Sequence, residues 1–410
     1  MKTEILKKAQ KLIDSTDNNI CNHCLGRKFS DVLDLDGNLK RGEEIRKNLK
    51  LDNPQNQCPI CNDIFNQINE DLIEKIDNKI NYLGIEFETF LVGSMLSKDI
   101  IENDETLDET FDFEVEPLKK ELNREIGKLL ENHFKKEVEF DSQDIVINID
   151  FKKFLEDKVN VRVQINPIFI EGKYNKFIRG IPQTKWPCRK CKGRGCDECN
   201  DTGKQYVMSV EELISERFLK ESKGYEAKFH GAGREDIDVK MLGSGRPFVL
   251  EIKEPKVRNL DLSLLEKEIN TENEGKTAYH NLKFVKRNRK AEIKVSSPDT
   301  FKVYRALVVC EEDYDIEKLE KLKSLDKIEQ FTPLRVEHRR AKKVRAKHVK
   351  NIEANVIDSK QFEIIVKTEG GLYIKELISG DGERTKPSIA DLLDVGCVCA
   401  QLDVIEVSEK

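Results

Sequence analysis

Residues 230–252 read HGAGREDIDVKMLGSGRPFVLEI, and this stretch holds the strongest candidate for chemistry in the chain. Arg234, Glu235 and Asp236 follow a glycine turn, and a second acid, Asp238, comes two residues later. Alternating apolar residues then lead into a strand-like run. Active sites commonly hold a carboxylate on a loop that a rigid sheet aims. Asp236 is therefore a candidate nucleophile or base, with Arg234 and Glu235 orienting it.

Two other interpretations of the same stretch stay open at this point. Asp238, Glu251 and Lys253 imitate the acid-acid-lysine pattern of Mg²⁺-dependent nucleases, in which two carboxylates hold the metal and the lysine positions water. The third interpretation is a charged hairpin whose glycines only make turns. The density of glycine, arginine and aspartate argues against the hairpin.

The bulk composition bounds the class of protein. The 410 residues are enough for two to three domains, and 38% of them are hydrophobic while 36% are charged. No apolar run reaches spanning length and no signal peptide precedes the first amphipathic segment, so we expect a cytoplasmic protein without a membrane partner.

The charge is segregated along the chain. The formal net charge is −6, yet residues 332–350 carry eight Lys or Arg against one Glu, and residues 283–294 carry six against one. A basic stripe on an acidic protein can still attract phosphates, because the local field sets the attraction. The alternative is two solvated surface runs. Two such runs beside the candidate site favour a polyanionic partner.

Eight of the eleven cysteines form four CxxC pairs, which indicate metal ligands rather than disulfides when no secretion signal is present. Cys21, Cys24, Cys58 and Cys61 can make a closed, structural Cys₄ zinc site. A tight knuckle resembling the zinc repeats of DnaJ-type proteins offers a possible second zinc site through Cys188, Cys191, Cys196 and Cys199. Cys310, Cys397 and Cys399 lie in apolar runs and are expected in the core.

Periodicity predicts helices around the first two CxxC pairs, an acidic loop at 98–116 and a helix opened by Pro117. Strand-like alternation surrounds that helix, and strands dominate after residue 225. A polar, basic loop or hairpin is expected at 270–299. The expected divisions are a helical zinc-binding segment at 1–83, an α+β domain at 84–186, a knuckle and linker at 187–204, and a catalytic domain at 205–410.

Three further features admit both a functional and a structural interpretation. Residues 168–186 mix aromatics with Lys and Arg, which suits RNA but also an ordinary strand-and-turn surface. Tyr304 lies on a predicted strand, and Lys375 follows a Gly-Gly turn and Tyr373. A strand tyrosine is most often a packing residue, so only a cleft shared with Asp236 would make these residues catalytic.

In this order, the motifs resemble the tenth-family ("Pus-ten") tRNA pseudouridine synthases of archaea and many eukaryotes. CNHCLGR and CPIC are similar to the family's zinc element, and FLVGSML and GKYNKFIRGIPQTKWPC to its THUMP-containing accessory domain. GREDIDVKMLGSGRPFVLEI, FKVYRALV, TPLRVEHRRA and TEGGLYIKELISGDGERTKPSIADLL are similar to its catalytic domain. The resemblance covers nearly the whole chain.

The resemblance implies roles for individual residues. Asp236 would be the catalytic nucleophile, Arg234 the arginine of the same element, Tyr304 the aromatic that stacks on the target base, and Lys375 the basic partner of the aspartate. Leu377 would be an apolar wall of the pocket, with Leu372 and Ile374 as alternatives. Independently of the resemblance, the basic run and the residue before Ile374 supply the other expected substrate-binding residues: Arg339, Arg340, Lys342, Lys343, Arg345 and Tyr373.

The resemblance also implies the fold, substrate and cofactors. We expect an α+β protein with an N-terminal zinc-bearing, THUMP-like α/β module and a C-terminal pseudouridine synthase domain on a mixed, mostly antiparallel sheet. The substrate would be uridine 54, uridine 55 or both in the T-loop of tRNA. Catalysis would need no cofactor, zinc would be structural, and the protein would act as a monomer. A non-catalytic tRNA-binding protein is the remaining alternative.

Overall fold

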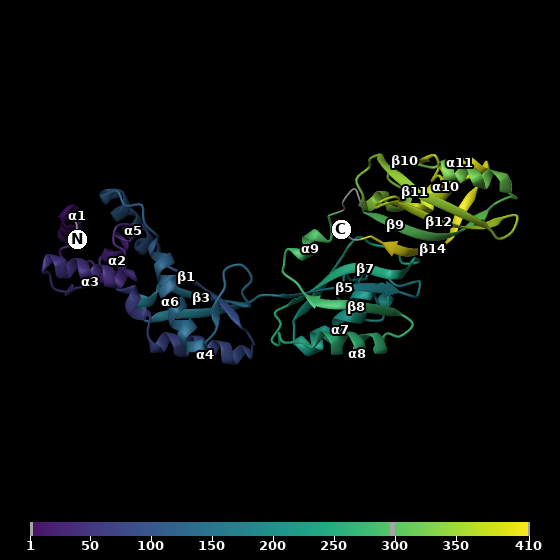
Figure 1. The fold of residues 1–410 in the computed structure, drawn as a ribbon. Helices are drawn as coiled ribbons and strands as arrows, with labels where there is room; N and C mark the ends of the chain where they lie inside the picture. The colour runs from purple at the N-terminus through teal and green to yellow at the C-terminus, as the bar shows by residue number, and fades with distance from the viewer. Residues whose placement is uncertain (1–2, 296–299, 409–410) are drawn as a thin grey trace. The chain divides into compact units, whose positions relative to one another are not determined.

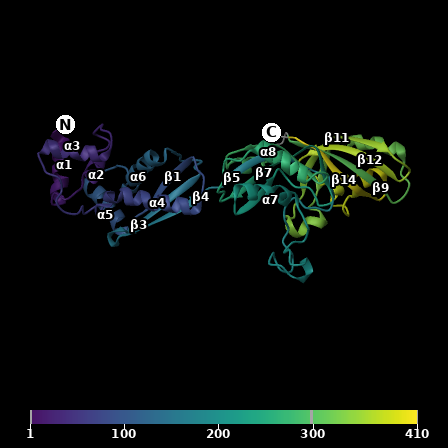
Figure 2. The ribbon, with the colours of Figure 1, turned by 90° about the horizontal axis from the view of Figure 1, so that it is seen from below.

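A computed structural model describes residues 3–295 and 300–408, which fall into two compact units, residues 1–166 and 167–410 (Figures 1 and 2). We describe each unit by itself. None of the helices in the described part of the chain is long and apolar enough to cross a membrane.

Unit 1 begins with a helical segment and continues into a small α/β layer. Its sheet has the order β2-β1-β3-β4; β1 pairs in parallel with β2 and β3, and β3 pairs antiparallel with β4. The helical elements are α1 (Thr3–Ser15), α2 (Asn22–Arg27), α3 (Asn38–Leu49), η1 (Ile64–Gln67), α4 (Glu70–Leu83), α5 (Lys98–Phe111), α6 (Leu118–Phe134) and η2 (Phe154–Glu156). The strands are β1 (Thr89–Met95), β2 (Glu137–Val138), β3 (Ile145–Lys153) and β4 (Lys158–Ile165).

The helix predicted to open at Pro117 is confirmed as α6, and apolar residues four apart mark the buried faces of α6 and α4. α6 buries Leu118, Leu122, Ile126 and Leu130 on one face, and α4 buries Leu72, Ile76 and Ile80. One core cluster contains these residues together with the first four cysteines and the apolar residues of β1 and β3. The segment that carries these cysteines and the sheet therefore share one core.

The predicted acidic loop at 98–116 is wrong, because most of it is helix α5. The buried face of α5 holds Ile100 and Leu107 but also an acid, Asp104. A buried acid breaks the apolar stripe by which an amphipathic helix is recognised in a sequence. The helix is possible because the cations that neutralise Asp104 come from another element.

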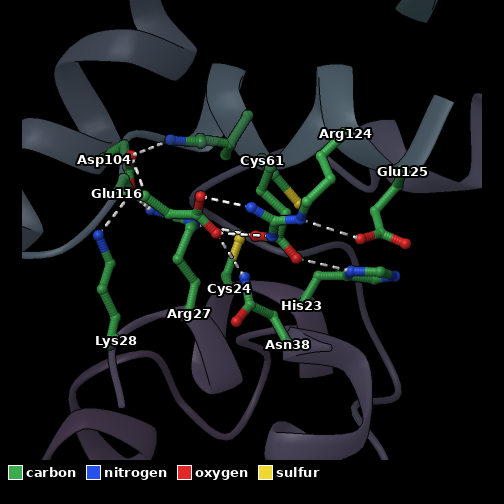
Figure 3. Close-up of polar contacts among 12 residues, drawn as sticks. His23, Cys24, Arg27, Lys28, Asn38, Cys61, Asp104, Glu116, Arg124 and Glu125 are labelled. Atoms are coloured by element: carbon green, nitrogen blue, oxygen red, sulfur yellow. Dashed lines mark hydrogen bonds and ion pairs between the residues drawn. The ribbon is translucent and has the colours of Figure 1, made fainter. Parts of the chain in front are cut away.

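Those cations belong to α2 and the residue after it (Figure 3). The fully buried guanidinium of Arg27 donates to both oxygens of Asp104, at 3.0 and 2.9 Å, and through Nε to Glu121 at 3.0 Å. Lys28 donates to Asp104 at 2.7 Å, and His23 Nδ1 lies 2.9 Å from Glu121. The network joins α2 to α5 and α6, and hence the cysteine segment to the helices beside the sheet.

Unit 2 is built on one large mixed sheet. Its strands are β5 (Ile168–Lys176), β6 (Glu226–Gly231), β7 (Lys240–Lys253), β8 (Thr277–Phe284), β9 (Phe301–Cys310), β10 (Lys327–Gln330), β11 (Arg345–Val356), β12 (Gln361–Glu369), β13 (Thr385–Lys386) and β14 (Cys397–Val407). The helical elements are η3 (Asp197–Cys199), α7 (Val210–Ser222), α8 (Leu262–Glu272), α9 (Arg289–Glu292), η4 (Ile316–Ser324), η5 (Leu334–Arg339), α10 (Ile374–Ser379) and α11 (Ile389–Leu393).

The sheet order is β13-β10-β11-β12-β9-β14-β7-β5-β8, with β6 paired to β7. All of these pairs are antiparallel except β14 with β7, so the predicted mixed, mostly antiparallel sheet is confirmed. β14 pairs in parallel with β7 at Met241 and antiparallel with β9 at Tyr304, so it joins these two strands. This junction places the loop at 232–239 beside the centre of the sheet.

Two segments differ from the sequence-based expectation. β5, which was assigned to the domain at 84–186, pairs with β7 and β8, so the structure divides the chain after residue 166. The expected loop or hairpin at 270–299 contains β8 and α9; residues 296–299 lie outside the described part of the chain. β8 is not evident from the sequence because only Thr277 and Tyr279 are buried and polar residues occupy much of the remaining strand.

Asp104→Asn should destabilise unit 1 by about 3–5 kcal/mol, because it leaves Arg27 and Lys28 buried without their shared counter-charge. Hydrogen exchange of the α2 and α5 amides in the full chain measures the loss. Glu105→Gln, an exposed acid on the same helix, is the matched control and should leave exchange within experimental error. Equal protection in the two variants would show that the network contributes no net stability.

Candidate active site

A cavity of about 470 Å³ opens over the junction of β7, β9 and β14. Segments from the whole of unit 2 meet there, including the loop at 234–239 and the start of α10. Its lining residues are Trp186, Arg234, Glu235, Asp236, Ile237, Asp238, Val239, Arg246, Tyr304, Arg335, Val336, Arg340, Leu372, Tyr373, Ile374, Lys375, Leu402 and Val404. The structure thus brings the predicted residues Asp236, Arg234, Tyr304 and Lys375 into one cleft.

Two cations face the carboxylate of Asp236. Arg335 Nη1 donates to Asp236 Oδ2 at 2.7 Å, and Lys375 Nζ lies 3.6 Å from the same oxygen. Lys375 also donates to both oxygens of Asp238, at 2.9 and 2.7 Å. Burial alone would raise the pKa of Asp238, but the hydrogen bond and charge of Lys375 hold that pKa below its ordinary value. Lys375 therefore bridges the two acids, and Arg335 orients Asp236.

Arg335 itself is held from two sides. Its Nε donates to Glu376 at 2.5 Å, and its guanidinium lies 5.8 Å from the centre of the Tyr373 ring. Tyr373 is fixed through its backbone, which exchanges hydrogen bonds of 2.9 Å with the buried amide of Gln330. Sequence reasoning missed Arg335 as a site residue, because nothing separates it from the seven other cations of the run at 332–350.

Under the Asp236 loop lies a buried charged pair. Glu235 accepts hydrogen bonds from the hydroxyl of Tyr174 at 2.9 and 2.7 Å, and Arg246 Nε lies 3.0 Å from Glu235 Oε2. Both side chains of the ion pair are about 1% exposed. The sheet register creates this arrangement, because Tyr174 on β5 sits directly opposite Arg246 on β7.

A buried lysine, Lys176, binds backbone carbonyls of the Asp236 loop and of a second segment near Ile181. The ammonium of Lys176 donates to the carbonyls of Ile181 at 3.0 Å and of Asp236 and Ile237 at 3.2 Å each. Burial lowers the pKa of Lys176 to about 8, although Glu235, 3.9 Å away, favours its charged form. Two hydrogen bonds from Lys176 thus fix the loop that carries Asp236, and the third ties that loop to the segment at Ile181.

The expected surface at 168–186 is therefore largely an internal support. Tyr174 and Lys176 are fully buried, and Arg179 donates to the carbonyls of Asp238 at 2.8 Å and Leu402 at 2.7 Å. Neither the RNA-binding nor the solvated-surface interpretation fits these three side chains. Trp186 differs, since it lines the cavity.

Tyr304 stands on β9 beside the acid. Burial is the main cause that raises its pKa to about 12, so its phenol is neutral at neutral pH. Lys302, two residues earlier on the strand, has its pKa lowered to about 7 by burial and by the charge of Arg246. Glycine suits position 233 because its φ is +86°, a conformation that other residues rarely adopt, and an added Cβ would also lie 3.0 Å from the Lys302 ammonium and 3.1 Å from Arg246.

The remaining predicted residues divide into three groups. Arg234 packs over the ring of Trp186 at 4.9 Å, and Tyr373 and Arg340 line the cavity. Lys343 and Arg345 line an adjoining groove, and Lys342 pairs with Glu337 at 2.8 Å. The side chain of Arg339 lies outside the described part of the chain.

Leu377 is fully buried, and it is absent from the cavity lining. The two alternatives considered for the apolar wall, Leu372 and Ile374, do line the cavity. The reason is that residues from 374 begin helix α10, which the sequence pattern did not predict. The helix turns Leu377 into the core.

The nuclease interpretation requires Asp238, Glu251 and Lys253 to form one metal site, and the structure does not bring them together. Glu251 accepts from Lys290 at 3.1 Å and lies 2.8 Å from His230, while Lys253 donates to Glu226 at 2.5 Å. Neither residue lines the cavity that contains Asp238. Among the described residues, the only clusters with metal-ligand geometry are cysteine sets.

Each of these two sets brings four Sγ atoms within 4.8 Å of one another: Cys21, Cys24, Cys58 and Cys61 in unit 1, and Cys188, Cys191, Cys196 and Cys199 in unit 2. Both sets can hold a metal ion. Cys310 and Cys397 are buried as expected, with their sulfurs 3.0 Å apart, whereas Cys399 is only partly buried.

With this geometry established, the chain was compared with known proteins. Residues 169–408 match the family described as "Pus10, C-terminal", and residues 73–150 match "Pus10 THUMP domain, archaeal". The "tRNA pseudouridine synthase Pus10" of Methanothermobacter marburgensis is 49% identical over 408 residues, 99% of each chain. The chain belongs to the Pus10 family. It is accordingly a tRNA pseudouridine synthase, an isomerase.

Other Pus10 relatives extend the similarity. The relative from Methanocaldococcus jannaschii is 44% identical over 94% of this chain and 83% of its own, and that from Pyrococcus furiosus is 38% identical over 98% of each. The predicted THUMP domain is confirmed and falls within unit 1. A solved Cbf5-Nop10-Gar1 complex matches 48% of this chain and 45% of its own at 19% identity, with a TM-score of 0.31.

Lys176→Met should reduce turnover by roughly a hundredfold, because small misplacements of a reacting group carry penalties of that size. Affinity for tRNA should stay within about twofold, since Lys176 is buried beneath the cavity. Single-turnover assays and binding titrations separate the two effects. Lys228→Met, which removes an exposed strand lysine, is the control. A larger loss of binding than of turnover would contradict a positioning role.

Proposed function

We propose that this enzyme isomerises uridine 54, uridine 55 or both in the T-loop of tRNA, with Asp236 as the nucleophile. The observation that carries the proposal is the pairing of Asp236 with Arg335 and Lys375 beside Tyr304 in one open cavity. The carboxylate is carried by a fixed loop and oriented by two cations. This arrangement is suited to attack on one carbon atom, C1′ of the ribose.

In the proposed reaction, Asp236 attacks C1′ of the ribose as the bond between C1′ and N1 of uracil breaks, and the electron pair of that bond leaves with the uracil. The detached uracil rotates in the cavity, and C5 bonds to C1′ as the bond between C1′ and the carboxylate breaks. The hydrogen on C5 then leaves as a proton, and N1 takes up a proton. Arg335 and Lys375 would offset charge changes on Asp236 during these steps. No metal or organic cofactor takes part.

Tyr304 would stack on the target base and take part in a later proton transfer. Its neutral phenol is suited to a stacking face with a polar edge. The target base must leave its stack to reach the cavity, at a cost of a few kcal/mol. Stacking on Tyr304 and apolar contact with Leu372 and Ile374 would offset part of that cost.

The substrate backbone would follow the groove that adjoins the cavity. Arg340, Lys343, Arg345 and Lys347 line this groove, and Arg340 and Tyr373 belong to both concavities. Clustered cations along a groove bind phosphates by releasing counterions. The THUMP domain would hold the acceptor end of the tRNA, and the two cysteine sets would hold structural zinc.

Asp236→Asn and Asp236→Ala should abolish isomerisation while tRNA binding persists. The assay is tritium release from a tRNA transcript labelled at uridine C5, with EDTA present and intact RNA verified on a gel. Transcripts carrying cytidine at position 54 or 55 identify the modified uridine. Turnover in either variant would contradict the nucleophile; tRNA binding without release by the wild-type enzyme would favour a non-catalytic binding protein.

Replacing Arg340, Lys342 and Lys343 with Gln should weaken tRNA binding. The slope of log K against log salt should fall by roughly one for each lost phosphate contact. Replacement of Lys220, Lys223 and Lys267 with Gln makes the same charge change on exposed residues at α7 and α8 and is the control. An unchanged slope would make the cluster a solvated surface.

A further inference from the structure

The knuckle at 185–206 is not used by the proposed reaction, although it lies between the support strand β5 and helix α7. It contains no core other than its four cysteines, three of which are buried. A segment of this length without an apolar core is not expected to hold one conformation unless a metal or disulfides cross-link it.

The sulfur geometry fits a metal. The Sγ distances are 3.9 Å between Cys188 and Cys196, 3.8 Å between Cys191 and Cys199, and 3.7 Å between Cys196 and Cys199. Zinc bonds of about 2.3 Å in a tetrahedron separate sulfurs by about 3.8 Å. Backbone amides of Gly195 and Gly203 donate to the sulfurs of Cys191 and Cys199 at 3.2 Å, as partners of thiolates do.

The two ends of the knuckle are joined at the rim of the active-site cavity. Gln205 N donates to the carbonyl of Trp186 at 3.0 Å, and Cys188 N donates to that of Gly203 at 2.7 Å. Trp186 lines the cavity and lies against both Arg234 and Tyr206. The base of the knuckle is therefore part of the cavity rim.

Charge on the knuckle is asymmetric. Its first arm, residues 185–194, exposes five cations and no acid: Lys185, Arg189, Lys190, Lys192 and Arg194. Lys190 forms an ion pair with Glu198 of the second arm at 3.0 Å. Its second arm, residues 197–201, exposes three acids: Asp197, Glu198 and Asp201. Figure 2 shows the knuckle as the teal segment that projects from the body of unit 2.

We propose that the knuckle is a second grip on tRNA, in which a metal-clamped loop presents its basic arm to the phosphates next to the flipped nucleotide. This inference rests on the proposed function and adds a contact surface to it. The metal folds the loop and takes no part in the reaction. Trp186 links the grip to the cavity, so phosphate binding by the arm fixes the strand that delivers the base.

The test uses the full-length metal-bound protein and unmodified tRNA transcript. Arg189→Gln, Lys190→Gln and Lys192→Gln are combined, and the triple variant at Lys220, Lys223 and Lys267 is the matched control. Arg194 is kept, because its Nε donates to the carbonyl of Cys191. Zinc content, tRNA affinity across salt concentrations and single-turnover tritium release at saturating tRNA are measured for each protein.

We expect the knuckle variant to keep its zinc and its saturated rate within about twofold. Its affinity should fall about tenfold or more near physiological salt, with a salt slope reduced by two to three. A second variant, C188S with C199S, should lose one zinc per chain and show a comparable fall in affinity.

Affinity and slope equal to those of the control would overturn the inference, as would a slower saturated rate without weaker binding. Failure of the proposed function is distinguishable: wild-type protein would then bind tRNA without releasing tritium, and the affinity measurement would still judge the knuckle. Wild-type protein that does not bind tRNA would overturn both.

Discussion

The active site of unit 2 depends on the buried ion pair between Glu235 and Arg246. Both charges are removed from water, which is tolerable only because each is paired and hydrogen-bonded. Glu235 immediately precedes Asp236, so fixing the first acid restricts the second. Lys176 completes the restriction by binding the carbonyl of Asp236 itself. The carboxylate of Asp236 can then face the open cavity while carbonyls of its loop bind a buried lysine.

The cations that contact Asp236 come from distant parts of the chain. Arg335 lies 99 residues away, and Lys375 binds the neighbouring Asp238 across 137 residues. β9 and β14 pair with each other in the middle of the sheet, and the segments at 335 and 375 lie over this junction. The chemistry is thus assembled by sheet topology, with few contributions from neighbours in sequence.

Unit 1 also contains buried charges that are tolerated because opposite charges are buried beside them. Arg27 and Lys28 are buried because Asp104 and Glu121 are buried with them, and these pairs attach the cysteine segment to α5 and α6. In both units a buried charge network occupies the place where two substructures meet. Removing one partner of such a network costs much more than the network contributes as a whole, which makes these positions sensitive to substitution.

The sequence by itself determined the local features. The CxxC pairs, the apolar faces of α4 and α6 and the Arg-Glu-Asp loop can be recognised because their spacing is set within one or two turns of chain. The family motifs also identified Asp236, Tyr304 and Lys375 as residues of one site. The tertiary structure alone decided that Arg335 faces Asp236, that Tyr174 and Lys176 are supports, and that α5 buries an acid. The physical reason is that these outcomes require charges from distant segments to neutralise one another, and only strand order and register determine which charges meet.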